Sequence, residues 1–156
     1  MMSRVKKGLV AGIFATIAVS VLEIPNMFLG WFDPLQSVIV NVLGMPGNLA
    51  VGWGIHIFSG VFILGPLFAM LYPRLPTDTP ETKGIAFAVT AWVLMMGGIV
   101  LMGDIGTFTA SAGFGTFGWL LFTHAVFGIV LGNVYMRQVT REKRANAAFV
   151  GSAPAH

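Results

Sequence analysis

The stretch Gly54-Ile55-His56-Ile57-Phe58-Ser59-Gly60 places a histidine inside an apolar run, and the pattern recurs in Phe122-Thr123-His124-Ala125-Val126-Phe127-Gly128. Both copies have the form His-x-x-x-Gly. Each copy lies in a hydrophobic segment of about 20 residues, which is the length that a helix needs to cross a bilayer. The two stretches therefore predict two membrane helices that each carry one histidine.

The composition also favours a membrane protein. Of the 156 residues, 56% are hydrophobic and only 10% are charged. A soluble domain has roughly a quarter of its residues charged, so lipid must solvate much of this surface. The sequence has no cysteine, which excludes disulfides and thiolate-bound metals.

Four apolar segments predict an all-α fold, a polytopic membrane four-helix bundle that forms a single domain over residues 1–140. The expected spans are residues 8–30, 49–72, 80–104 and 117–137. Residues 105–116 are rich in Gly, Ser, Thr and Phe, which predicts an irregular external loop. Residues 141–156 are first basic and then small and polar, which predicts a disordered tail.

The basic residues predict the orientation. All nine Lys and Arg lie outside the apolar cores of the spans, at the N-terminus, between the second and third spans, and at the C-terminus. Four spans put these three regions on one side, and the positive-inside rule makes that side cytoplasmic. We therefore expect both termini in the cytoplasm and the chain in the plasma (inner) membrane of a bacterium. The basic charge reflects this topology, so no nucleic-acid partner is predicted.

Local signals predict where several helices begin and end. In the first external loop, Asp33 is a good N-cap, Pro34 suits the first helical position and Gly44 suits the stop, which predicts a short interfacial helix. Asn48 and Thr79 are expected to cap the second and third spans.

The two halves of the chain resemble each other. Each half has an outward helix with a carboxylate near its external end, Glu23 or Asp104, followed by an inward helix with His-x-x-x-Gly. Two helices per half give both halves the same orientation. The expected repeat is therefore parallel, about an axis along the membrane normal.

Residue counting brings the polar residues to one depth. At ~1.5 Å per residue, His56 and His124 both lie ~10 Å below the outer boundary, and Glu23 lies at a similar depth. Asp104 is nearer to the interface. Ionisable residues inside a membrane mark candidate functional sites, so we expect these four side chains to form a cluster in the outer half of the bundle.

Three functions are compatible with this cluster. Two imidazoles and two carboxylates can hold a metal ion, or the imidazoles can ligate a haem b, within a larger membrane redox complex. An imidazole beside a carboxylate can instead bind a quinone or relay protons. The third alternative is a cofactor-free accessory subunit in which the carboxylates fix helix registry. No nucleophile–base pair with an orienting group is apparent, so the chain is not expected to be an enzyme on its own.

Glycines at helical spacing predict close helix packing at Gly60, Gly128 and Gly132. Small-residue faces of this kind are expected to dock other membrane subunits or a second copy of the chain in the lipid bilayer. The pattern His124, Gly128, Gly132 resembles a loose class of small uncharacterised bacterial four-helix membrane proteins. The first copy departs from it, because Gly60 is followed by Gly65. The resemblance implies the four-helix fold and no established activity.

Overall fold

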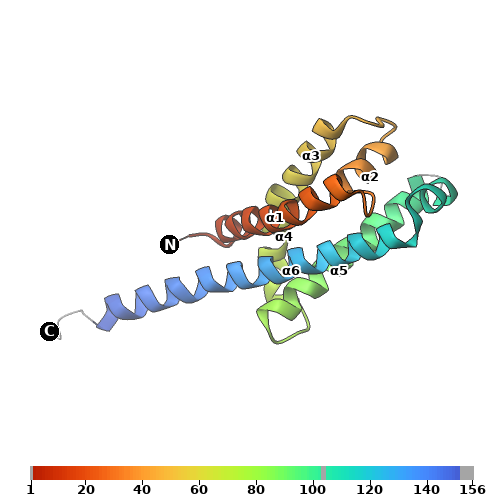
Figure 1. The fold of residues 1–156 in the computed structure, drawn as a ribbon. Helices are drawn as coiled ribbons and strands as arrows, with labels where there is room; N and C mark the ends of the chain where they lie inside the picture. Colours follow the sequence, from red (N-terminus) through yellow and green to blue (C-terminus); the bar gives the residue numbers. More distant parts are fainter. Residues whose placement is uncertain (1, 103–104, 152–156) are drawn as a thin grey trace.

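The computed structural model describes residues 2–102 and 105–151, and the regular elements in this part of the chain are helices (Figure 1). They are α1 (Arg4–Leu29), α2 (Leu35–Val42), α3 (Leu49–Phe58), η1 (Ser59–Leu64), α4 (Gly65–Leu71), η2 (Tyr72–Arg74), α5 (Pro80–Met102) and α6 (Ile105–Gly151). Four helical stretches are long and apolar enough to cross a membrane, at Arg4–Leu29, Leu49–Arg74, Pro80–Leu101 and Gly113–Phe149. The all-α class and the four apolar helices are confirmed, and they suggest a multi-pass membrane protein.

Two of the predicted caps are present. The Asn48 side chain accepts a hydrogen bond from the Val51 N–H, and Thr79 Oγ1 accepts one from the Thr82 N–H. The prediction for Asp33 is wrong, because α2 begins one residue later and Pro34 is its N-cap. Pro34 has an extended backbone, and its carbonyl accepts the first helical bonds.

The short helix α2 packs against the rest of the protein, and its position at the membrane interface stays a prediction. Leu35, Gln36, Val38 and Val40 are all buried. A methyl group built at Gly52 of α3 would overlap the Gln36 carbonyl, so the two helices touch at backbone distance. Leu35 and Val38 also pack with Ile99 of α5 and Leu120 of α6. Helix α2 therefore closes one end of the bundle.

The second span is not one continuous α-helix. It changes to a π-helix at η1, where the Gly65 N–H donates to the Gly60 carbonyl five residues earlier. Pro66 follows directly and stands at the start of α4. A proline has no N–H to donate and its ring crowds the carbonyl four residues earlier, and the wider π turn relieves this crowding.

Helix α6 is longer than predicted in both directions. Residues 105–112 are helical where an irregular loop was expected, and the break comes at Gly113, whose φ is 68°. At the other end the helix continues to Gly151, so residues 141–151 are helical where disorder was expected. Figure 1 shows this end of α6 projecting past the other helices.

Glycines lie where the helices cross most closely. On α1, Gly8 and Gly12 face the backbone of Gly60 and Gly65. A methyl group built at Gly84 of α5 would overlap the carbonyl of Gly128 on α6. A methyl group at Gly132 would overlap the carbonyl at the first residue of α5. The bundle is thus built from two glycine-lined crossings, α1 on η1–α4 and α5 on α6, with α1 also packed against α6.

Candidate functional site

A cavity of about 300 Å³ lies within the bundle and is partly open to the outside. It is bounded by α1, α2, α3 with η1, α5 and α6, and its walls are mainly aliphatic. Four polar residues line it: His56, Ser59, Thr123 and His124. The size and the apolar lining with a few polar groups are typical of sites for small molecules.

The tautomer of His124 follows from its hydrogen bond. Its Nδ1 lies 2.7 Å from the carbonyl oxygen of Leu120. A carbonyl oxygen can only accept, so Nδ1 carries the proton and donates. In a neutral imidazole the other nitrogen, Nε2, then has a lone pair. An apolar cavity disfavours the doubly protonated, charged ring, so His124 offers the cavity an acceptor.

His56 is buried and is oriented by two neighbours. Its Nε2 lies 3.5 Å from Ser20 Oγ on α1, and its ring meets Trp53 edge to face, with centroids 5.8 Å apart. Ser20 Oγ already donates to the Thr16 carbonyl at 2.8 Å, so it accepts from the N–H of His56. In the part of the chain that the structure describes, His56 Nδ1 takes part in no hydrogen bond.

The two hydroxyl groups in the lining also donate their hydrogen bonds to backbone carbonyls. Ser59 Oγ donates to the His56 carbonyl at 3.1 Å, and Thr123 Oγ1 donates to the Leu120 carbonyl at 3.0 Å. The four polar side chains of the cavity therefore present acceptors and have no free donor. His56 and His124 line the same cavity.

Glu23 belongs to a separate polar centre near the C-terminal end of α1. It is fully buried. Asn26 Nδ2 donates to its Oε2 at 3.3 Å, and Trp119 Nε1 donates to its Oε1 at 3.1 Å. The backbone N–H of Leu35, the first residue of α2, also faces this carboxylate. Glu23 thus connects α1, α2 and α6 and lies outside the lining of the cavity.

The metal and haem interpretation finds no support here. Within residues 2–102 and 105–151 there is no group of three or more His, Asp or Glu side chains that could hold a metal ion. Asp104, the fourth predicted ligand, lies outside the described residues. What the structure brings together is the histidine pair, with Glu23 engaged elsewhere.

Sequence reasoning missed three residues that shape this region. Trp119 stacks on Phe32 with ring centroids 5.5 Å apart while it donates to Glu23. Asn26 holds the turn after α1 through two 3.0 Å hydrogen bonds to the backbone of Phe32. Pro66 was a visible signal, because a proline inside an apolar span predicts an irregular helix.

A family model matches residues 2–146 and carries the description "Family of unknown function (DUF6789)". The chain belongs to the DUF6789 family. No curated protein and no solved structure matches it. For this DUF6789 protein, the chemistry of the cavity is therefore the basis for any functional proposal.

Proposed function

We propose that this protein binds a lipophilic molecule that carries a hydroxyl group, of the quinol class, in the cavity between His56 and His124. The observation that supports this is the donor–acceptor balance of the lining: each of the four polar side chains has its proton engaged elsewhere. A ligand with hydroxyl donors complements these acceptors. A quinone carbonyl does not, because it is an acceptor itself.

The position of the cavity supports access from the bilayer. The cavity is partly open, and the two helices on either side of it, α3–η1 and α5, are not among the closely packed helix pairs of the described residues. Exposed apolar side chains surround this region, among them Phe58 and Phe62, which are both 57% exposed. A lipid-soluble molecule can therefore enter sideways between these helices without crossing water.

The orientation is part of the proposal. The N-terminus, the segment before α5 and the start of the projecting part of α6 lie at one end of the bundle, as the Lys7–Glu142 ion pair and the contact of Gly132 with Pro80 require. We propose that this basic end is cytoplasmic in a bacterial inner membrane, following the positive-inside rule. Association with other membrane subunits or with a second copy stays a prediction.

The test compares a short-chain alkyl hydroquinone with its dimethyl ether, which has the same ring but no donor. The protein, ¹⁵N-labelled at its three histidines, is titrated in detergent with each compound. We expect the hydroquinone to shift the Nε2 resonance of His124 and to bind roughly tenfold more tightly than the ether, because a hydrogen bond of about 1.4 kcal/mol corresponds to that factor.

His156 provides an internal reference whose resonances should not move. A His124→Leu variant should show a smaller preference for the hydroquinone over the ether, because it loses one of the four acceptors of the lining. Equal affinity of the unchanged protein for the two compounds, or shifts confined to His156, would overturn the proposal.

A further inference from the structure

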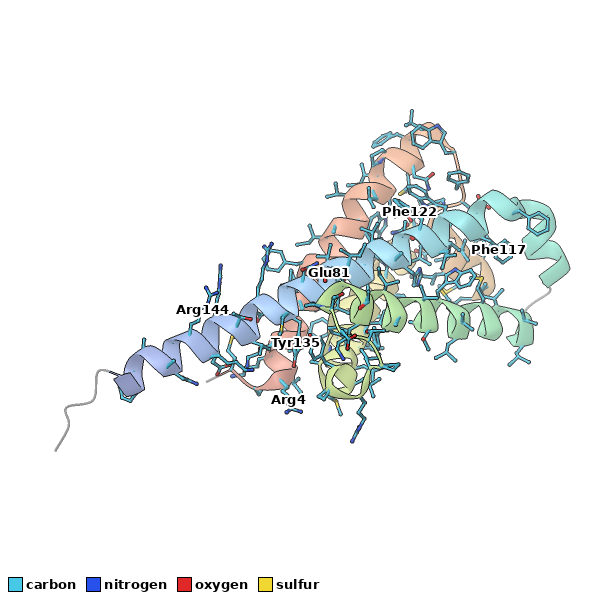
Figure 2. The ribbon with its side chains drawn as sticks, turned by 90° about the horizontal axis from the view of Figure 1, so that it is seen from below. Arg4, Glu81, Phe117, Phe122, Tyr135 and Arg144 are labelled. Atoms are coloured by element: carbon cyan, nitrogen blue, oxygen red, sulfur yellow. The ribbon has the colours of Figure 1, made fainter. Side chains whose placement is uncertain are left out.

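A second groove lies at the opposite end of the molecule, where α6 passes the beginning of α5. Its volume is about 380 Å³. It is lined by Pro80, Asn133, Met136, Arg137, Thr140, Arg141 and Arg144. Figure 2 shows Arg144 on the projecting part of α6, far from Phe117 and Phe122 near the other end of this helix. The groove is therefore remote from the histidine cavity.

The three arginines share one face of α6. Residues 137, 141 and 144 are separated by four and three positions, which brings side chains to the same side of a helix. All three are exposed. The described residues contain one ion pair, Lys7–Glu142, so none of the three guanidinium groups is matched by a carboxylate in this part of the chain.

One acidic side chain lies next to the groove. Glu81 lies near the side chains of Thr79 and Asn133, and Asn133 lines the groove. Glu81 stands in the first turn of α5, away from Arg144 on the projecting part of α6 (Figure 2). The remaining charge in the groove is that of three guanidinium groups, which repel one another unless an anion binds between them.

The groove runs along α6 from the beginning of α5 to the part of α6 that projects past the other helices. At one end it has Met136 and the first residue of α5, and at the other it has Arg144, past the apolar part of α6. A phospholipid complements these two ends, because it has an apolar acyl chain at one end and an anionic phosphate at the other. Arginine binds phosphate oxygens with two parallel hydrogen bonds, and basic pockets on the cytoplasmic side of membrane helices suit anionic headgroups.

We propose that this groove binds the phosphate of an anionic phospholipid. Arg137, Arg141 and Arg144 would contact the headgroup, and Met136 would contact the acyl chain. The lipid would then hold the projecting part of α6 at the membrane surface. The inference concerns a different site from the histidine cavity, so the failure of one leaves the other intact.

The experiment measures which lipids the protein keeps. The protein is reconstituted in nanodiscs of phosphatidylcholine with phosphatidylglycerol, released into mild detergent and examined by native mass spectrometry. We expect a clear preference for retained phosphatidylglycerol. The variant Arg137→Gln/Arg141→Gln/Arg144→Gln should lose this preference by roughly tenfold or more, as the loss of several charge-assisted hydrogen bonds requires.

The matched control is Lys6→Gln/Arg74→Gln/Lys143→Gln, which removes the same charge from exposed positions outside the groove. It should keep the preference. Equal losses in both variants would mean general attraction by net charge and would overturn the proposal. Displacement of the lipid by inorganic phosphate at similar concentration would also overturn it, because the groove would then be a site for free phosphate.

Discussion

Glu23 is a carboxylate enclosed by donors from three helices. Its two oxygens accept from Asn26 and Trp119, and the Leu35 N–H at the start of α2 also faces the carboxylate. A buried carboxylate is costly unless such bonds replace its hydration. The same bonds fix how α1 and α6 meet, and the carboxylate also faces Leu35, which lines the histidine cavity. Glu23 thus supports the site without contacting a ligand there.

The change Glu23→Gln tests this role. Glutamine keeps the shape but replaces one acceptor oxygen with an NH₂ group, so either Asn26 or Trp119 faces another donor. We expect a loss of about 2–3 kcal/mol in the free energy of unfolding, the range for a buried polar group left unpaired. Heat unfolding in detergent, followed by circular dichroism, measures the loss.

The matched variant is Trp119→Phe, which removes the donor to Glu23 and keeps an aromatic ring against Phe32. If the two residues act through their hydrogen bond, the double variant loses less stability than the sum of the single losses. Strict additivity would show that Glu23 and Trp119 contribute independently.

At the scale of the helix, the crossing of α5 and α6 depends on a missing side chain at Gly84. A methyl group there would overlap the backbone of Gly128, and backbone cannot move aside as a flexible side chain can. We expect Gly84→Ala to destabilise the protein by about 1–3 kcal/mol, as overpacking does, and to lower its melting temperature in detergent.

Gly97 lies on the same helix and provides the control, since a methyl group built there meets nothing within 4 Å. Gly97→Ala should be neutral or slightly stabilising, because alanine is the better helix former by about 1 kcal/mol. Similar losses at both positions would show that helix α5 tolerates no substitution, and the close crossing would then not be the cause.

The π turn at η1 forms part of the wall of the histidine cavity. It begins at Ser59, directly after the helix turn that carries His56, and it includes Gly60, which also lines the cavity. Gly60 approaches the Thr16 side chain on α1. One wide turn therefore lets Pro66 occupy the span while the histidine and α1 stay in contact. π turns of this kind are frequent at functional sites.

For the whole molecule, the features that could be predicted from the sequence are those that depend on residues close together in the chain. The apolar runs are visible in composition, and the caps at Asn48 and Thr79 act within three residues. The residue count that put His56 and His124 at one depth agrees with their common cavity. These features need no knowledge of which helices are neighbours.

The differences arise where distant residues meet. Glu23 and Trp119 are 96 residues apart, so the partner of this carboxylate could not be found by spacing. The helical tail is held by the Lys7–Glu142 ion pair and by Gln138, whose amide donates to the Lys7 carbonyl at 3.1 Å. The composition of residues 141–151 taken alone favoured disorder, because composition carries no information about these contacts with α1.

The orientation of the whole bundle is tested by labelling from one side. The protein has no cysteine, so single cysteines can be placed at Met45, in the turn after α2, and at Asp78, just before α5; both positions are exposed. With the basic end in the cytoplasm, an impermeant maleimide added to spheroplasts should label Met45→Cys at once. It should label Asp78→Cys only after the membrane is permeabilised. The reverse pattern would place the three arginines of α6 outside, away from the anionic cytoplasmic leaflet, and would contradict both the orientation and the leaflet expected for the bound phospholipid.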